Sequence, residues 1–342
     1  MLVFRTLTFA FLLTMVATPL FSQMVIKGKA YADYYYNVQN NNSDFEGLNG
    51  FWFRRVRLTV DNKISDILST RFRIEMATNG DFTTNGTIDP YLKDAYVNIK
   101  APIIGKDLFR IGIMETIGKK TVEKLWGYRG FEKTPTDFYK YRSSRDFGLL
   151  FTGKRGIFDY SLMIGNESSN KMEVNTKKMF YGNIGVKPID GLYIQTYYDR
   201  TINDDYESAM AQLFVAYELK KYGRLGVLFS NINQNSGETI EDSLTTVDQS
   251  NNILSIYAVA YLHNDLDLIL RFDWLSDELI NPTKMAYTPL TSTKGRTTGI
   301  FAGLSYKGIK NLFIMPYIGY FAYEEEGLDA DIYTRLTFEF RY

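Results

Sequence analysis

The 342-residue sequence predicts an all-β fold, a transmembrane antiparallel β-barrel of about sixteen strands with short periplasmic turns and long extracellular loops. Three observations predict this fold. Polar and apolar side chains alternate along many segments, the links between segments alternate between short and long, and the chain ends with an aromatic residue. Outer-membrane barrels combine a two-residue alternation, an even number of strands and turns that are short at one end of the barrel.

The first 22 residues have the pattern of an export signal. Arg5 is the only charged residue among them, an apolar run follows it, and Pro19 breaks the run before small Ser22. This order is typical of a secretory signal peptide, and the apolar run is too short to span a bilayer as a helix. We therefore expect cleavage after residue 22 and one barrel domain over residues 23–342.

Alternation is clearest between residues 51 and 77. One face of residues 51–63 carries Phe51, Phe53, Arg55, Arg57, Thr59, Asp61 and Lys63, and the other carries Trp52, Arg54, Val56, Leu58, Val60 and Asn62. In residues 69–77, Ser69, Arg71, Arg73, Glu75 and Ala77 alternate with Thr70, Phe72, Ile74 and Met76. A period of two predicts strands with one polar and one apolar face. Residues 266–274 and 331–342 repeat the pattern.

Sixteen segments follow this rule along the chain. Their centres lie near residues 31, 56, 73, 96, 111, 149, 162, 182, 196, 213, 228, 257, 270, 302, 317 and 336. The long links are expected at 37–50, 78–90, 116–144, 166–177, 201–207, 232–251, 275–296 and 324–330, with short links between the remaining pairs. This strict alternation places both chain ends at the short-turn end of the barrel.

The link at residues 116–144 is the candidate constriction loop. It carries Lys119, Lys120, Lys124 and Arg129, and its segment "TVEKLWGY" is expected to form one or two helical turns. Loops of this length are usually functional. Folded inward, the loop would narrow a pore; lying over the outside, it would not, and the sequence leaves both arrangements open.

Arginines dominate the polar face of the early strands. Arg55, Arg57, Arg71 and Arg73, with Arg110 further along, are expected to line the lumen together with Glu75. A turn centred near residues 64–65 predicts these opposite pairs: Arg57 with Arg71 or Arg73, and Arg55 with Arg73 or Glu75. Like charges directly opposite are destabilising, and a water-filled channel would screen them. Arg54 is predicted on the apolar face, reaching water at the end of its strand.

Composition excludes several function classes. The chain has 39 basic and 39 acidic residues, so it lacks the basic surplus of a nucleic-acid-binding protein. It has no Cys, and its single His, His263, is expected in a turn without a nucleophile motif, so no enzyme is predicted. The acidic runs "NDDY" and "YEEEG" fall in predicted long loops as solvated carboxylates. We expect neither a metal site nor a cofactor.

The stretch "FWFRRVRLTVDNKISDILSTRFRIEM" resembles the early hairpin of the phosphate-selective porin O and P family and related porins of Bacteroidetes. The resemblance covers roughly residues 50–150; beyond them the chain follows only the general barrel pattern. It implies a sixteen-stranded porin, commonly trimeric, with an arginine ladder in the lumen and lysines near the constriction. Arg55, Arg57, Arg71 and Arg73 match the ladder by position. The acidic residues expected in this lumen, however, do not fit a pore that selects phosphate.

These patterns predict a porin in the bacterial outer membrane for passive diffusion of small hydrophilic solutes. The arginine stripe predicts a preference for anions, and a balanced, non-selective wall is the alternative. A different reading is a non-conducting barrel that acts as a receptor or as an assembly or secretion component through its long loops. Expected partners are outer-membrane lipid and lipopolysaccharide, solutes, and the barrel-assembly machinery through the terminal strand bearing Phe338, Phe340 and Tyr342.

Overall fold

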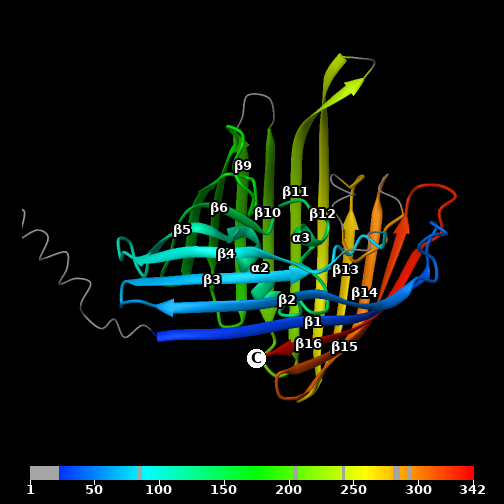
Figure 1. Cartoon of the computed structure of the whole chain (residues 1–342), viewed down its shortest axis with the longest axis horizontal. Helices are drawn as coiled ribbons and strands as arrows, with labels where there is room; N and C mark the ends of the chain where they lie inside the picture. Colours follow the sequence, from blue (N-terminus) through cyan, green and yellow to red (C-terminus); the bar gives the residue numbers. More distant parts are fainter. Residues whose placement is uncertain (1–22, 84–86, 203–206, 241–242, 280–285, 292–294) are drawn as a thin grey trace, which may run out of the picture.

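The computed structural model describes residues 23–83, 87–202, 207–240, 243–279, 286–291 and 295–342. Within them, sixteen antiparallel strands form one closed barrel in which each strand pairs with its neighbours in sequence and β1 pairs with β16 (Figure 1). The predicted fold is confirmed. The predicted export signal lies outside the described residues.

All sixteen predicted centres fall within strands. The strands are β1 (Gln23–Gln39), β2 (Asn49–Lys63), β3 (Leu68–Ala77), β4 (Asp89–Lys100), β5 (Leu108–Glu115), β6 (Arg145–Arg155), β7 (Phe158–Gly165), β8 (Lys178–Val186), β9 (Leu192–Ile202), β10 (Ser208–Glu218), β11 (Gly223–Ile240), β12 (Ser243–His263), β13 (Leu266–Leu275), β14 (Thr297–Ile309), β15 (Leu312–Tyr323) and β16 (Asp331–Arg341). Two helices, α2 (Ile117–Trp126) and α3 (Pro135–Phe138), lie between β5 and β6. No helix among the described residues is long and apolar enough to cross a membrane.

One predicted long link is wrong. Residues 232–251 were expected as a long link of the alternating pattern, but β11 and β12 continue through most of them as a paired ladder from Ile232↔Asn251 to Ile240↔Ser243. Main-chain hydrogen bonds sustain an antiparallel ladder whatever the side chains are. The two strands therefore project as a hairpin beyond their neighbours (Figure 1).

The barrel has its polar side chains inside and an apolar belt outside. On β13, Asp267, Arg271 and Asp273 are buried, whereas Leu270 and Phe272 are exposed. β16 repeats this arrangement. Alternation along each strand therefore confirms the predicted faces in these strands, because a closed sheet has only an inside and an outside.

The closing seam lies between β1 and β16, whose ladder runs from Lys29↔Arg341 to Gln39↔Ile332. Gly28 and Tyr342 exchange backbone hydrogen bonds of 2.5 and 3.1 Å there. The last residue of the chain therefore takes part in closure, which leaves no free sheet edge between the first and last strands.

The close approach of the β4 backbone to Gly112 on β5 can be tested by substitution. Its φ is +126°, and a Cβ at this position would lie 2.1 Å from the carbonyl oxygen of Ala95 on β4. We expect Gly112→Ala to lower the free energy of unfolding by more than about 1 kcal/mol, because the new Cβ meets backbone that cannot move aside. Urea unfolding of the refolded barrel in detergent micelles measures this change.

Gly182→Ala on β8 is the matched control. A Cβ there would have only Leu162 Cδ2 as a neighbour, at an ordinary contact distance of 3.7 Å. We expect unchanged or slightly raised stability. Equal losses in the two variants would contradict the close approach at Gly112.

Candidate functional site

The loop at residues 116–144 folds into the lumen. Its helix α2 packs against β8 and β10, and α3 packs against β12. Trp126, Phe131 and Phe138 are at most 2% exposed. This settles the position that the sequence left open.

Local sequence explains the shape of the loop. Gly127 ends α2 in the left-handed conformation (φ 77°), and its N–H donates to the Glu123 carbonyl at 3.0 Å. Pro135 begins α3, where its missing N–H costs no hydrogen bond. Between the helices, the Trp126 indole N–H donates to the Glu132 carbonyl at 2.8 Å.

Aromatic packing fills the part of the lumen beside β12–β16. The Phe131 ring stacks on Tyr317 at a centroid distance of 4.4 Å, and Trp126 meets Tyr257 edge-on at 4.9 Å. Phe138 packs between Phe301 and Phe321 in the same way. This side of the loop is a packed core, so the open space must lie elsewhere.

Wall arginines bind the main chain of the loop. Arg54 donates to the Gly130 carbonyl, and Arg271 donates to the Lys133 carbonyl. Arg224 donates to the Leu125 carbonyl at 2.5 Å. Carbonyls inside a barrel have no ladder partner, so these bonds satisfy groups that would otherwise be buried unpaired.

The predicted position of Arg54 is wrong. It is 4% exposed and points inward, where its Nε lies 2.9 Å from Asp33. The β1–β2 ladder passes from Tyr31↔Arg55 to Ala32↔Phe53, so Arg54 is an extra residue in a β-bulge. A bulge shifts the alternation by one residue. For the same reason Phe51 and Phe53, assigned to the polar face, are exposed on the outside.

The predicted opposition of arginines is also wrong. The β2–β3 register places Arg57 opposite Glu75, Asp61 opposite Arg71 and Thr59 opposite Arg73. Arg71 donates to Asp61 at 2.6 and 3.0 Å. The turn has four residues, 64–67, so the register differs from that of a turn centred on residues 64–65. Opposite charges therefore face each other across the hairpin.

Glu75 is the centre of an ion-pair cluster. Its side chain is 1% exposed and lies 3.0 Å from Arg55 and 3.1 Å from Lys93, and it also binds Arg57 and the Tyr91 hydroxyl. The sequence analysis named Glu75 and the two arginines but missed Lys93 and Tyr91.

A second bulge explains why Lys93 was missed. The β3–β4 ladder passes from Arg73↔Asp94 to Ile74↔Leu92, so Lys93 is the extra residue and both Lys93 and Asp94 are buried. Asp94 then binds Arg73 at 2.7 Å and Arg145 at 2.5 Å. Two adjacent charged residues in a strand are the only sequence signal that this bulge and the one at Arg54 share.

Arg110 lies inside the lumen as predicted, but it is held against the wall. Its Nε donates to Asn98 at 2.7 Å, and its guanidinium lies 4.1 Å from the centroid of the Tyr96 ring. Cation–π stacking of this kind favours a fixed side chain.

The predicted loop cations divide into two groups. Lys119 and Arg129 are buried and both bind Asp137 at 2.8 Å, and they lie 3.4 and 3.2 Å from Glu123. Burial raises the pKa of Glu123, but these two cations outweigh burial and hold its pKa below the usual range. Lys120 and Lys124, in contrast, are exposed.

Two neighbouring cavities of 400 and 670 Å³ extend from the short-turn end beneath α2. They share Lys29, Glu115 and Glu123. Their basic lining residues are Lys27, Lys29, Arg57, Arg71, Arg73, Lys106, Lys120, Lys124, Arg129, Arg145, Lys154, Lys187 and Arg341. Their acidic lining residues are Asp61, Glu115, Glu123 and Asp159. The open space is therefore strongly basic, although the whole chain has no net charge.

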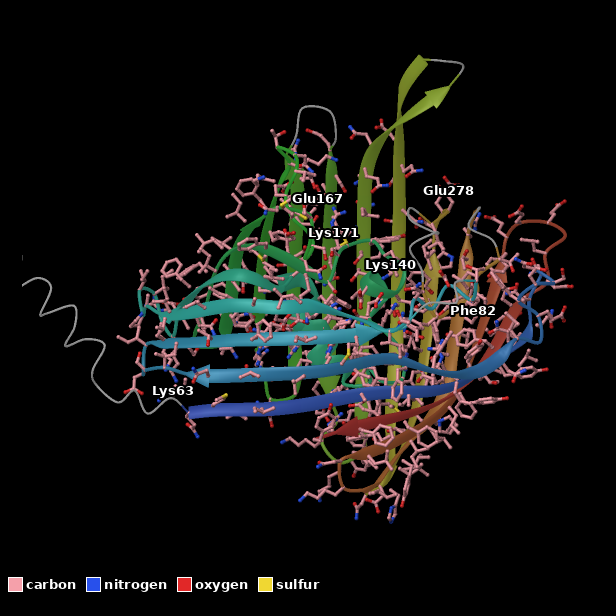
Figure 2. All side chains as sticks on the ribbon, viewed as in Figure 1. Lys63, Phe82, Lys140, Glu167, Lys171 and Glu278 are labelled. Carbon is pink, nitrogen blue, oxygen red and sulfur yellow. The ribbon has the colours of Figure 1, made fainter. Side chains whose placement is uncertain are left out.

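Not every predicted pore residue lines these cavities. Arg57, Arg71 and Arg73 line the smaller one, and Lys120, Lys124 and Arg129 line the larger one. Arg55, Glu75, Arg110 and Lys119 lie inside the barrel but line neither cavity. The side-chain view of Figure 2 shows how densely side chains fill the interior, with Lys140 labelled on the loop.

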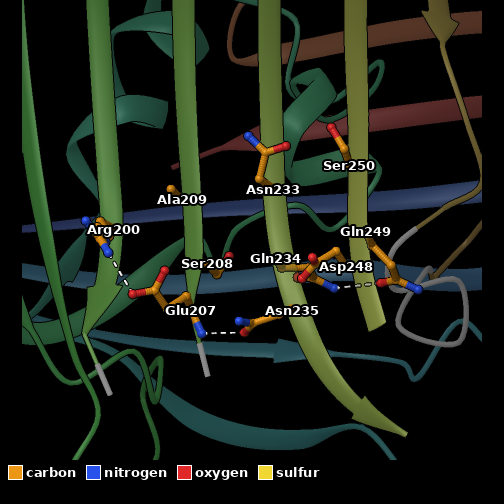
Figure 3. Close-up of a pocket in the computed structure, with 10 residues that line it drawn as sticks. All are labelled: Arg200, Glu207, Ser208, Ala209, Asn233, Gln234, Asn235, Asp248, Gln249 and Ser250. Carbon is orange, nitrogen blue, oxygen red and sulfur yellow. Dashed lines mark hydrogen bonds and ion pairs between the residues drawn. The ribbon is translucent and has the colours of Figure 1, made fainter. Parts of the chain in front are cut away.

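A third cavity, of 310 Å³, lies at the long-loop end between β9 and β12. Amide side chains dominate it, and Gln234 donates to Gln249 at 3.1 Å (Figure 3). Arg200 pairs with Glu207 at its edge at 2.7 Å. Asp248 also lines this cavity, so it carries one cation and two carboxylates, unlike the basic lining of the other two cavities.

The fold matches solved outer-membrane barrels. OmpF of Salmonella typhi in complex with daunomycin aligns with a TM-score of 0.68 at 11% identity, over 93% of this chain and 97% of that one. The outer membrane channel DcaP of Acinetobacter baumannii aligns with a TM-score of 0.66 at 9% identity, over 95% and 99%. In-vitro folded OmpT, an outer membrane protein of Vibrio cholerae, aligns with a TM-score of 0.65 at 11% identity, over 94% and 98%.

Identity this low establishes the shared fold alone. No protein-family model matches the sequence. No curated protein sequence matches it either. The resemblance to porins therefore holds for the barrel, while the phosphate-selective family has no support from these comparisons.

Arg54 gives a test of the loop anchors. We expect Arg54→Met to lower the free energy of unfolding by about 3–5 kcal/mol, because Asp33 stays buried without its partner. Hydrogen exchange at residues 128–134 is expected to accelerate, since the Gly130 carbonyl loses its donor. The control is Arg155→Met at an exposed turn, which should change neither quantity. Unchanged exchange in Arg54→Met would show that the loop does not depend on this bond.

The acidic side chains of the 116–144 loop set the lowest pH at which the loop stays packed. Burial raises the pKa of Glu132 and of Asp137, but Arg335 and Arg54 around Glu132, and Lys119 and Arg129 around Asp137, hold both pKa values below the usual range. A lowered folded-state pKa stabilises the fold above the unfolded-state pKa of about 4 and loses that contribution as pH falls further.

We therefore expect the loop to stay packed from pH 7 to about 4 and to loosen only at lower pH. A variant that keeps Trp126 as its sole tryptophan, Trp52→Phe with Trp274→Phe, reports this through its fluorescence maximum. A red shift between pH 7 and pH 5 would contradict the assignment.

Proposed function

We propose that this chain is an outer-membrane porin through which small hydrophilic solutes diffuse, and that it prefers anions. The observation that carries the proposal is the lining of the two short-turn cavities, with thirteen basic and four acidic side chains in a chain of zero net charge. A charged cleft with low-dielectric walls concentrates ions of the opposite sign.

The proposed selectivity element is the gap between α2 and the wall of β2, β3 and β6. Glu123 faces this gap from the loop, while Arg57, Arg73 and Arg145 face it from the wall. Arg57 pairs with Glu75, and Arg73 and Arg145 both pair with Asp94, so two carboxylates behind the wall compensate part of its charge. Anion preference would therefore arise from the excess of cations around the gap, whereas the predicted uniform arginine stripe would contribute less.

Membrane partners follow from the outside of the barrel. The apolar belt would face outer-membrane lipid, with lipopolysaccharide around the long-loop end. Exposed Phe340 on β16 and Tyr342 directly after β16 are the side chains that the barrel-assembly machinery would recognise. A homotrimer is also proposed, since in-vitro folded OmpT of Vibrio cholerae has a trimer form.

The first experiment places mature protein in a planar bilayer under a KCl gradient. We expect ohmic conductance steps and a reversal potential of anionic sign. Steps of cationic sign would keep the porin and remove anion preference. Correctly folded barrels without steps would remove the pore and leave the receptor or assembly component as the function.

Arg73→Gln tests the selectivity element directly. A unit charge about 8 Å from an ion in water contributes about 0.5 kcal/mol, so we expect the chloride-to-potassium permeability ratio to fall about two-fold. Arg155→Gln removes the same charge outside both cavities and should leave the ratio unchanged. The same ratio in wild type and Arg73→Gln would exclude this wall as the selectivity element.

A further inference from the structure

The β11–β12 hairpin extends beyond the strands on either side of it. The β10–β11 ladder stops at Gln234, and the β12–β13 ladder stops at Ile253. The ladder between β11 and β12 themselves runs on to Ile240↔Ser243 without a register shift. Figure 1 shows this pair of strands standing clear of the others at the long-loop end. In the described part of the chain, the outer edges of the pair therefore have no strand beside them.

The longer of these open edges belongs to β12 and begins beyond Asn252. The Asn252 N–H donates to Ser276 Oγ at 2.9 Å, and its carbonyl accepts from the Ser276 N–H at 3.0 Å, so both groups point to the β13 side. In an antiparallel ladder, every second residue shares this direction. The residues that present N–H and carbonyl groups to the open side are therefore Leu244, Thr246, Asp248 and Ser250. No described residue forms a main-chain hydrogen bond with them there.

This edge lacks the usual protection against pairing with another chain. Proteins commonly block a long open edge by placing Lys or Pro on it, or by a bulge that turns the strand away. Residues 243–252 contain neither Lys nor Pro. β12 also keeps its register with β11 throughout this stretch, so it has no bulge there. The edge therefore keeps the form that an incoming extended chain needs.

The sequence around this edge is acidic. Residues 225–260 contain Glu238, Glu241, Asp242 and Asp248 and no Lys, Arg or His. Asp248 lines the cavity at the foot of the hairpin (Figure 3), and no basic nitrogen of the described residues lies within 4.0 Å of its carboxylate. Like charges disfavour pairing with a second copy of the hairpin or with anionic lipopolysaccharide, whereas a basic partner is attracted.

We propose that the open edge of β12 binds an extended, basic segment of another protein, which adds to the hairpin as a further strand. Main-chain hydrogen bonds to the edge residues supply affinity in this mode of recognition, and side-chain contacts supply specificity. A Lys or Arg of the segment opposite Asp248 provides such a contact, because facing side chains on neighbouring strands lie about 5 Å apart at Cβ. Binding of this kind is independent of the proposed pore, since the edge lies outside the barrel wall.

A short synthetic peptide in which Lys alternates with Thr, blocked at both ends, is the probe. Titrated by calorimetry into the refolded barrel in an uncharged detergent, it should bind saturably and more weakly as KCl is added. Amide hydrogen exchange at residues 244–250 should slow when the peptide is bound. The same peptide with every amide N-methylated keeps its charges and loses its donors, so it should not bind. Equal binding of the two peptides would leave charge attraction alone and overturn the added strand.

Thr246→Pro tests the edge itself. It removes one N–H from the open side and leaves the ladder with β11, whose hydrogen bonds come from the residues before and after it. We expect the affinity for the peptide to fall about ten-fold or more, because a donor is lost and the ring obstructs the edge. Thr246→Ala keeps the N–H and is the matched control, with the affinity of wild type. Heat-modifiable electrophoretic mobility verifies that each variant is folded. Unchanged affinity in Thr246→Pro, or no saturable binding to wild type, overturns the site.

Two further measurements identify the occupant. Asp248→Asn should weaken the Lys–Thr peptide about two- to five-fold, as expected for loss of one exposed ion pair. Sedimentation without peptide should give wild type and Thr246→Pro the same oligomeric state. Association of wild type that Thr246→Pro abolishes would assign the edge to a second copy of this chain and overturn the basic segment.

Discussion

Hydrogen bonds from wall arginines to the main chain of the 116–144 loop hold the interior of this barrel in place. A guanidinium has five donors in a fixed fork, so it can bind a carbonyl and a carboxylate together. Arg54 binds the Gly130 carbonyl while pairing with Asp33, and Arg271 binds the Lys133 carbonyl while pairing with Asp273. Loop carbonyls and buried charges thus satisfy one another, which avoids the penalty of about 1–3 kcal/mol for each group left unpaired.

The position of the loop determines where the barrel is open. Aromatic rings from α2, α3 and the segment between them pack beside β12–β16, while the cavities of 400 and 670 Å³ lie beside β1–β9 beneath α2. Solutes and ions would therefore meet charged walls along this side and not the aromatic core. Hydrogen bonds hold the main chain of the loop, and packing holds its aromatic rings. The loop therefore forms a fixed wall of the open space.

Charge in the lumen falls into two zones. Around Glu75 and Asp94, two bulges bring consecutive charged residues inward, and each carboxylate binds at least two cations. At the short-turn end, basic side chains outnumber acidic ones around the two cavities, although Lys27 and Lys29 pair with Asp61 and Glu339. The first zone stabilises the contact between wall and loop, and the second creates the positive potential on which the proposed anion preference rests.

The sequence by itself determined the barrel, because a period of two residues repeated sixteen times leaves only an inside and an outside for the side chains. It also placed Arg57, Arg71 and Arg73 in the lumen, since alternation decides the face. The tertiary structure decided the features that the alternation of polar and apolar residues does not specify. A bulge inserts one residue and reverses the faces of the strand on one side of it, which moved Arg54 inward and buried Lys93. Register across the β2–β3 turn converted an expected repulsion into the pair of Arg57 with Glu75. The loop could enter the lumen or lie outside it with the same residues, and only distant partners such as Arg271 on β13 and Arg335 on β16 determine that it enters.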